Sequence, residues 1–195
     1  METSTGVDLY WLPLGAGGHS VRLSGRAYEA LVAAAQRRRR CDLYHSALVV
    51  HVPGGRFVVE QTPVPAGPAA ERGVVRDGPV GARWAGRWRL CRYEIRRWRD
   101  GVIADIDEAV ASPCRVTDDA FAAQRLLELV PSVPPVVWGR DEAGTGEMWN
   151  SNSVVAWLIV SAGLDCGSAP LPAHGRAPGW GAGVEVALRS RPATL

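Results

Sequence analysis

The amino-acid sequence predicts an α+β protein in which an antiparallel sheet packs on helices. Two apolar, β-branched runs flank a turn signal at residues 53–55, and this pattern is typical of a β-hairpin. Residues 91–95 alternate apolar with charged side chains, as a half-buried strand does. Helical spacing of apolar residues follows Asp118-Asp119 and again Asn150. With no repeat and no domain linker, these elements are expected to form one domain.

The first half of the chain is predicted to contain an arm, a helix and the hairpin. Residues 8–18 are apolar up to a group of glycines, which indicates a short strand followed by a loop. Apolar residues at three- and four-residue intervals after Ser24-Gly25 predict a helix that ends near Arg40. The hairpin strands are expected at residues 43–52 and 56–60.

The second half is predicted to begin with a loop or lid at residues 62–81, which are dense in Pro, Gly and Ala. An arginine-rich strand follows and ends at the turn Asp100-Gly101. Helices are predicted over residues 120–129 and over the apolar run that Gly163 ends. Gly and Pro return after residue 166, and a last strand is expected at residues 184–188.

Length and organisation predict a single domain over residues 1–195. A chain of this size buries enough surface to need no disulfide or metal for stability. We divide it into an N-terminal arm and helix (1–42), a core (43–165) and a Gly/Pro-rich tail (166–195).

The composition excludes several classes of function. All 22 basic residues are arginine, so no lysine is present for a Schiff base, a phosphate-binding loop or a Ser-Lys dyad. The four cysteines match neither a CxxC pair nor a zinc ribbon, so reduced thiols and no metal or other cofactor are expected. The N-terminus lacks a secretory signal and the apolar runs are too short to span a bilayer, which predicts a cytoplasmic protein without a transmembrane segment.

Positive charge is concentrated between Arg83 and Arg99, where seven arginines and four aromatic residues accompany Glu94 as the only acid. Arginine interleaved with aromatic rings is the basis for one candidate function, binding of an anionic surface or of nucleic acid. The alternation of the strand instead favours one buried face and one solvated charged face, so nucleic acid is not the expected partner.

The start of the last apolar helix is the strongest candidate for a chemical site. Asn150 is a good N-cap, which places Ser151 in the first turn, where unpaired backbone N–H groups stabilise a developing anion. His45 on the first hairpin strand is a candidate general base. Glu60 on the second strand is a candidate orienting carboxylate, with Gln61 as the alternative. Helix capping alone also explains the Asn/Ser pattern, since both residue types favour helix starts.

Three short segments together resemble the circularly permuted branch of the papain-like NlpC peptidase superfamily. Residues 44–50 (YHSALVV) are similar to its histidine strand, residues 58–61 (VVEQ) to the strand with its third polar residue, and residues 150–155 (NSNSVV) to its nucleophile motif. Members include the lecithin:retinol acyltransferase-like proteins and the PPPDE peptidases, in which that motif reads approximately Asn-Cys-Asn-His-Phe with the cysteine as nucleophile. The resemblance implies a permuted papain-like fold for the core, residues 43–165.

The chain departs from this family at the nucleophile, because Ser151 stands where the family has cysteine. The resemblance implies a hydrolase or acyltransferase acting on an amide or ester bond, with Ser151 as nucleophile, His45 as base and Glu60 as orienting residue. A serine hydroxyl is far less acidic than a thiol, so the substitution equally fits an inactive binding module that keeps the cleft. Either function predicts a small-molecule, lipid or peptide ligand and leaves the oligomeric state open. The expected ligand contacts are Trp149, Asn150, Asn152 and Gln61.

Overall fold

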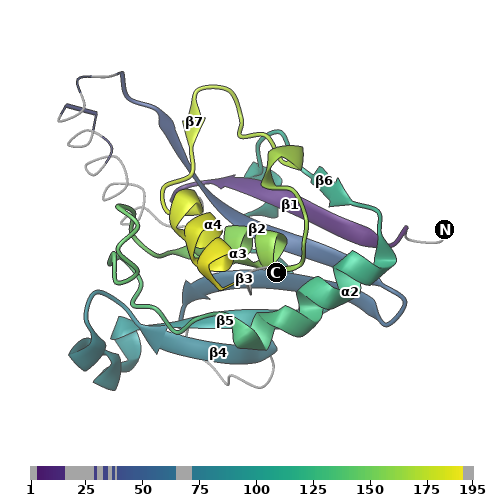
Figure 1. Cartoon of the computed structure of the whole chain (residues 1–195), viewed down its shortest axis with the longest axis horizontal. Coiled ribbons are helices and arrows are strands. Elements are labelled where there is room, and N and C mark those ends of the chain that lie inside the picture. The colour runs from purple at the N-terminus through teal and green to yellow at the C-terminus, as the bar shows by residue number, and fades with distance from the viewer. Residues whose placement is uncertain are drawn as a thin grey trace.

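The computed structural model describes residues 4–15, 29, 33–34, 37, 39–64 and 72–190. Within these residues, seven strands and three α-helices form an α+β fold, as the sequence predicts (Figure 1). The helix predicted to end near Arg40 falls largely outside the described residues. No helix among the described residues is both long and apolar enough to cross a membrane.

Six strands form an antiparallel sheet in the order β4-β5-β3-β2-β1-β6, and β7 pairs in parallel with the beginning of β2. The predicted hairpin is confirmed, since β2 and β3 are joined at the turn between Val52 and Gly55. The strands are β1 (Gly6–Pro13), β2 (Asp42–Val52), β3 (Gly55–Pro63), β4 (Val74–Pro79), β5 (Arg92–Arg99), β6 (Cys114–Thr117) and β7 (Gly175–Arg176).

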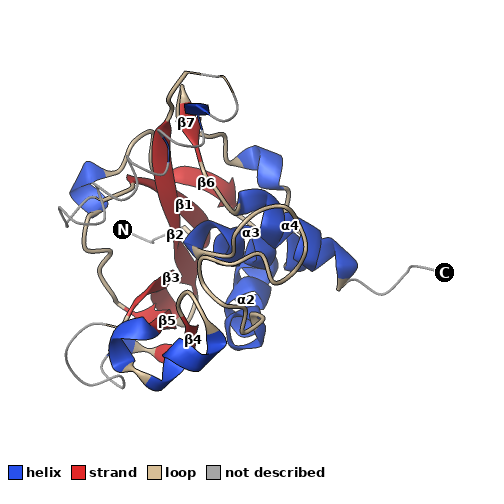
Figure 2. Cartoon of the chain, turned by 90° about the vertical axis from the view of Figure 1, so that its left-hand side faces the viewer, coloured by secondary structure: helices blue, strands red, loops and turns tan. Residues whose placement is uncertain are grey.

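The three helices gather on one side of the sheet (Figure 2). They are α2 (Ala120–Leu129), α3 (Ser151–Ser161) and α4 (Trp180–Arg189). The Asp119 side chain accepts hydrogen bonds from the first turn of α2, which confirms the predicted cap. Helix α3 is buried around its whole circumference, because α2, α4 and the sheet all pack on it.

Side-chain alternation gives the sheet two different faces. The helix face carries Leu48 and Val59, which belong to the large core cluster shared with α2 and α3. The opposite side, which we call the loop face, carries Ala47 and Val58, which pack with Ile103 from the segment after β5. Because successive strand residues point to opposite sides, each polar strand residue is assigned to one face by its position.

The strand predicted at residues 184–188 is wrong, because this segment belongs to α4. The valines of this segment resemble a strand locally, yet Ala182, Gly183 and Ala187 form a buried helical stripe against α3. A Cβ atom on Gly183 would lie 2.1 Å from the Ser153 carbonyl oxygen, so glycine is what permits this close helix contact.

Two further boundaries differ from the prediction. The loop predicted at residues 62–81 contains the end of β3 and the edge strand β4, which pairs with β5 despite its Gly and Pro. The arginine-rich segment becomes a strand only from Arg92 onward. Before that point it forms two 3₁₀ turns, Arg83–Arg87 and Arg89–Cys91.

Candidate functional site

The first turn of α3 is fixed by a reciprocal capping arrangement. The Asn150 side chain accepts hydrogen bonds from the backbone N–H groups of Asn152 (2.9 Å) and Ser153 (3.4 Å). In return, the Ser153 hydroxyl accepts one from the Asn150 backbone N–H at 3.1 Å and donates to the Gly179 carbonyl at 2.7 Å. Asn150 is therefore the N-cap that the sequence predicts, and both side chains hold the helix start in place.

Asn152 attaches this helix start to β2. Its Nδ2 group donates to the Tyr44 and Pro178 carbonyls, both at 2.9 Å, and its Oδ1 atom accepts from the Ser46 hydroxyl at 2.9 Å. With only 2% of its surface exposed, Asn152 is a buried polar group whose bonding capacity is used by three partners. The structure thus brings the predicted nucleophile segment directly against the predicted histidine strand.

The sheet opens between β2 and β3 at this point. Their pairing ends at Leu48–Val59, whereas β2 stays paired with β1 as far as Tyr44 and β3 with β5 as far as Pro63. Continuing the register, the next rung on the same side would join Ser46 to Gln61. We call this opening, bounded by Ser46 and Gln61, the split. Figure 1 shows the two strands separating, with α3 and α4 near the opening.

Side chains from three elements converge on the split from the helix face. The Leu14 backbone N–H donates a hydrogen bond to the Leu43 carbonyl, which therefore points toward the β1 side of β2. Carbonyl groups of successive strand residues point to opposite edges, so the Tyr44 carbonyl points toward the β3 side. The Asn152 amide occupies this side and takes up the Tyr44 carbonyl. Ser46 and Gln61 both point to the helix face, because they pair with Trp11 and Ile95, which belong to the large core cluster.

Gln61 is the least explained polar residue at the split. Only 5% of its surface is exposed, and neither its Nε2 nor its Oε1 atom has a hydrogen-bond partner among the described residues. A buried amide without partners costs stability, so such a group calls for a structural or functional reason. The sequence identified Gln61 as a ligand contact, and both polar atoms of its side chain are without a partner in the part of the chain that the structure describes.

Ser151 and Trp149 are both largely buried. Ser151 begins α3 with 5% of its surface exposed, and its hydroxyl takes part in none of the hydrogen bonds that hold the described helix start. Trp149 has 1% exposed and lies within the large core cluster, so its indole packs the core and presents almost no surface to a ligand.

His45 lies on the loop face, because it pairs with Leu12 of the smaller cluster. Burial lowers the pKa of His45 below its ordinary value of 6.5, and the Asp105 charge opposes this only in part. The imidazole is therefore neutral at neutral pH. Alternation points the His45 ring and the Ser46 side chain to opposite sides of β2, so the Ser151 hydroxyl and the His45 ring approach the sheet from different faces.

Glu60 lies on the loop face, as His45 does, whereas Gln61 points to the helix face. The Glu60 carboxylate is bound by the Arg96 guanidinium at 2.7 Å. Burial raises the pKa of Glu60, and the Arg96 charge offsets this only in part. Glu60 is thus assigned to an ion-pair network, and the acidic group whose charge acts on His45 is Asp105. Because Asp105 lies in an irregular segment, no local sequence pattern points to it.

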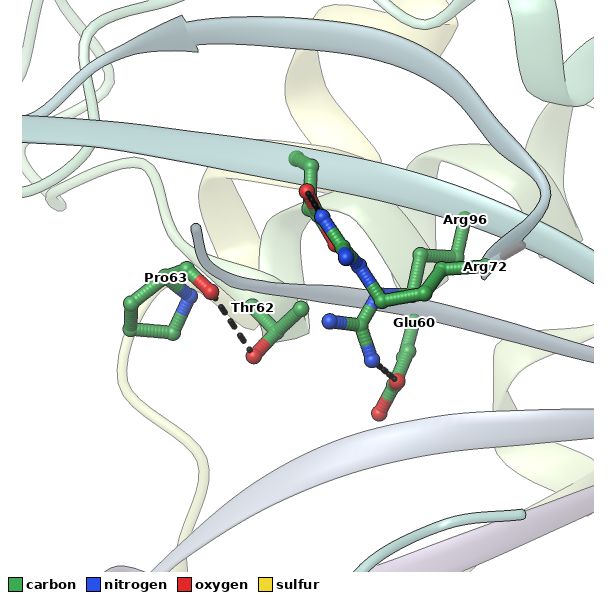
Figure 3. A network of polar contacts seen from close by, with 6 residues as sticks. Glu60, Thr62, Pro63, Arg72 and Arg96 are labelled. Carbon is green, nitrogen blue, oxygen red and sulfur yellow. Dashed lines mark hydrogen bonds and ion pairs between the residues drawn. The ribbon is translucent and has the colours of Figure 1, made fainter. Parts of the chain in front are cut away.

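The network continues from Arg96 to Glu94 and Arg72. Figure 3 shows Arg72 and Arg96 beside Glu60. Glu94 accepts hydrogen bonds from Arg96 Nε at 2.7 Å and from Arg72 Nε at 2.9 Å. Burial alone would raise the pKa of Glu94, but its hydrogen bonds and ion pairs with Arg72 and Arg96 outweigh burial and lower it. The arginine-rich strand therefore uses part of its charge internally, on the loop face.

Comparisons with protein-family models, with curated protein sequences and with solved structures find no match for this chain. The resemblance to permuted papain-like enzymes thus remains a prediction from three short segments. Among the described residues, no group of three or more His, Cys, Asp or Glu side chains is placed to hold a metal ion.

Proposed function

We propose that the protein is a binding module that recognises an amide or acyl carbonyl group of a peptide or acyl ligand at the split, without covalent chemistry of its own. The observation that carries this proposal is the buried Gln61 amide, which lacks any partner among the described residues on the face of the sheet that α3 covers. A buried polar group without a structural partner is stabilised when a ligand supplies one.

The chemistry at the split suits a peptide-like group. The Gln61 side chain offers one donor group and one acceptor, which matches the acceptor and donor of a peptide bond. The N-terminus of α3 adds the positive end of a helix dipole, which favours a carbonyl oxygen. Pro178, just before α4, accepts hydrogen bonds from both Asn150 and Asn152, which attaches this segment to the start of α3 beside the split.

Replacing Gln61 with methionine tests the proposal through two opposite effects. We expect the variant to lose ligand binding and to gain about 1 kcal/mol in the free energy of unfolding, because an unpartnered buried amide gives way to an apolar side chain of similar size. Binding is measured by amide chemical shifts of the labelled protein titrated with N-acetylated dipeptide amides. Stability is measured by urea denaturation.

Gln124→Met is the matched control, since Gln124 is exposed on α2, where its side chain donates a hydrogen bond to Glu128. It is expected to change neither binding nor stability. A Gln61→Met variant that loses stability would show that the amide has a structural partner. Absence of saturable shifts at Ser46, Gln61 and Ser151 in the wild-type protein would exclude the proposed ligand class.

A serine hydrolase or acyltransferase is the second candidate function, favoured by the docking of α3 on Tyr44 and Ser46, the residues that flank His45. A neutral imidazole has the free lone pair that a general base requires. In this alternative Ser151 is the nucleophile, His45 the base and Asp105 the carboxylate, which requires the His45 ring to turn from the loop face through the split toward Ser151.

A fluorophosphonate probe separates the two functions. The binding module predicts no adduct on Ser151, because no base activates its hydroxyl. Labelling that Ser151→Ala and His45→Ala both remove, and that the exposed-site control Ser168→Ala retains, would replace the binding module with the hydrolase. Intact mass spectrometry of the labelled protein gives the readout.

A further inference from the structure

The connection between β4 and β5 carries an unusual set of exposed apolar side chains. It consists of the two 3₁₀ turns Arg83–Arg87 and Arg89–Cys91, which we call the tip. Trp84 is 62% exposed, Trp88 57% and Leu90 94%, although large apolar side chains are ordinarily buried. Figures 1 and 2 show the tip at the far end of β4 and β5, projecting beyond the sheet.

Arginine surrounds these apolar groups. Arg83 on the tip forms an ion pair with Glu142 at 2.8 Å, and Arg92, which begins β5 directly after the tip, forms one with Asp77. The tip, residues 83–91, contains three arginines and no acidic residue, and Arg87 and Arg89 are exposed on it. The tip thus combines protruding apolar side chains with a positive rim.

We propose that the tip binds the surface of a membrane rich in anionic lipid, independently of the ligand site at the split. A bilayer interface accepts this combination, since Leu90 and the indoles enter the boundary between headgroups and acyl chains while arginines pair with lipid phosphates. A protruding leucine with 94% of its surface in water gains most from contact with hydrocarbon.

The arrangement of the two indoles argues against single-stranded nucleic acid as the partner. Trp84 and Trp88 contact each other edge to face, with ring centroids 5.5 Å apart and planes at 85°. Rings packed on each other in this way do not present two parallel platforms for stacked bases. Leu90 also contributes nothing to base stacking, whereas it adds apolar area to a lipid contact.

The test is co-sedimentation of the full chain with vesicles of phosphatidylcholine alone and of phosphatidylcholine mixed with phosphatidylserine. We expect binding to the anionic vesicles, little binding to the neutral ones, and a blue shift of tryptophan fluorescence. The double variant Trp84→Ser/Leu90→Ser is expected to lower the partition coefficient about tenfold or more, because both apolar anchors are lost. Arg87→Gln/Arg89→Gln is expected to lower it as well and to reduce its salt dependence.

Phe121→Ser is the matched control, because Phe121 is 76% exposed on α2, which begins on the opposite side of the view in Figure 1. It is expected to leave vesicle binding unchanged. Failure of the wild-type protein to bind anionic vesicles at low salt, or equal losses from Phe121→Ser and from the tip variant, would overturn the proposal. Binding to a single-stranded oligonucleotide but not to vesicles would identify the tip as a nucleic-acid site instead.

Discussion

Replacing Asn152 with alanine is expected to lower the free energy of unfolding by about 3 kcal/mol, because buried groups that lose their partners pay their full desolvation cost. The substitution removes the partner of the Ser46 hydroxyl and a donor to the Tyr44 and Pro178 carbonyls. These hydrogen bonds join β2, α3 and the segment before α4, so their loss weakens the attachment of α3 and of this segment to β2 beside the split. Urea denaturation with an unchanged m-value would measure the loss.

Asn152→Asp sharpens this test because it preserves the shape of the side chain. At neutral pH a carboxylate would face the Tyr44 and Pro178 carbonyls without a donor, so the loss is expected to match or exceed that of alanine. Acidification should restore part of the stability, since the protonated group regains one donor. Ser161→Ala, at the other end of α3, is the control and should be near neutral. Wild-type stability of Asn152→Asp at neutral pH would contradict the assigned hydrogen bonds.

Replacing Glu94 with glutamine is expected to lower the free energy of unfolding by about 3 to 5 kcal/mol, because the substitution leaves buried positive charge without compensation. Glu94 is 2% exposed and accepts from Arg72 and Arg96, which lie on the same side of the sheet. The matched control is Glu60→Gln, at the more exposed end of the network. Glu60→Gln is expected to lower the free energy of unfolding by clearly less than Glu94→Gln does, since Arg96 keeps Glu94 as a partner. Equal losses from the two variants would contradict the central role of Glu94.

The pH dependence of stability should distinguish the two carboxylates. The pKa of Glu94 in the folded protein lies below its ordinary value of 4.5. The contribution of Glu94 to the free energy of unfolding is therefore complete above pH 4.5 and is lost as the pH falls through the folded pKa. The pKa of Glu60 in the folded protein is raised above 4.5. The contribution of its titration to the free energy of unfolding is therefore complete below pH 4.5 and is lost as the pH rises through the folded pKa. Wild-type protein should therefore lose more stability on acidification below 4.5 than Glu94→Gln does.

Local patterns predicted the elements around the site correctly where local physics decides them. The turn at residues 53–55, the cap at Asp119 and the cap at Asn150 all lie where the sequence places them. Each depends on residues within a few positions along the chain, such as a side-chain oxygen that reaches the N–H groups of the next turn. The predictions failed at α4 and β4, where packing against α3 and pairing with β5 outweigh local composition.

The candidate site could be predicted only in part. The sequence identified Asn150, Ser151, Asn152 and Gln61 by residue type, and the structure places Asn152 and Gln61 on the helix face at the split. It did not identify Ser46 as a bonding partner, because that contact spans 106 positions in the chain. His45 and Glu60 were also found by type, yet their face depends on strand register, which places them on the loop face with Asp105 and Arg96.

By itself, the sequence determined an α+β class, the hairpin, the capped start of α3 and the absence of lysine chemistry. These properties follow from composition and from spacings of a few residues, so no long-range contact is needed to decide them. Only the tertiary structure decided where β2 and β3 separate, which strand residues meet α3, and which carboxylate serves which arginine. Those features depend on the register between distant strands, where a shift of one residue moves every side chain to the other face of the sheet.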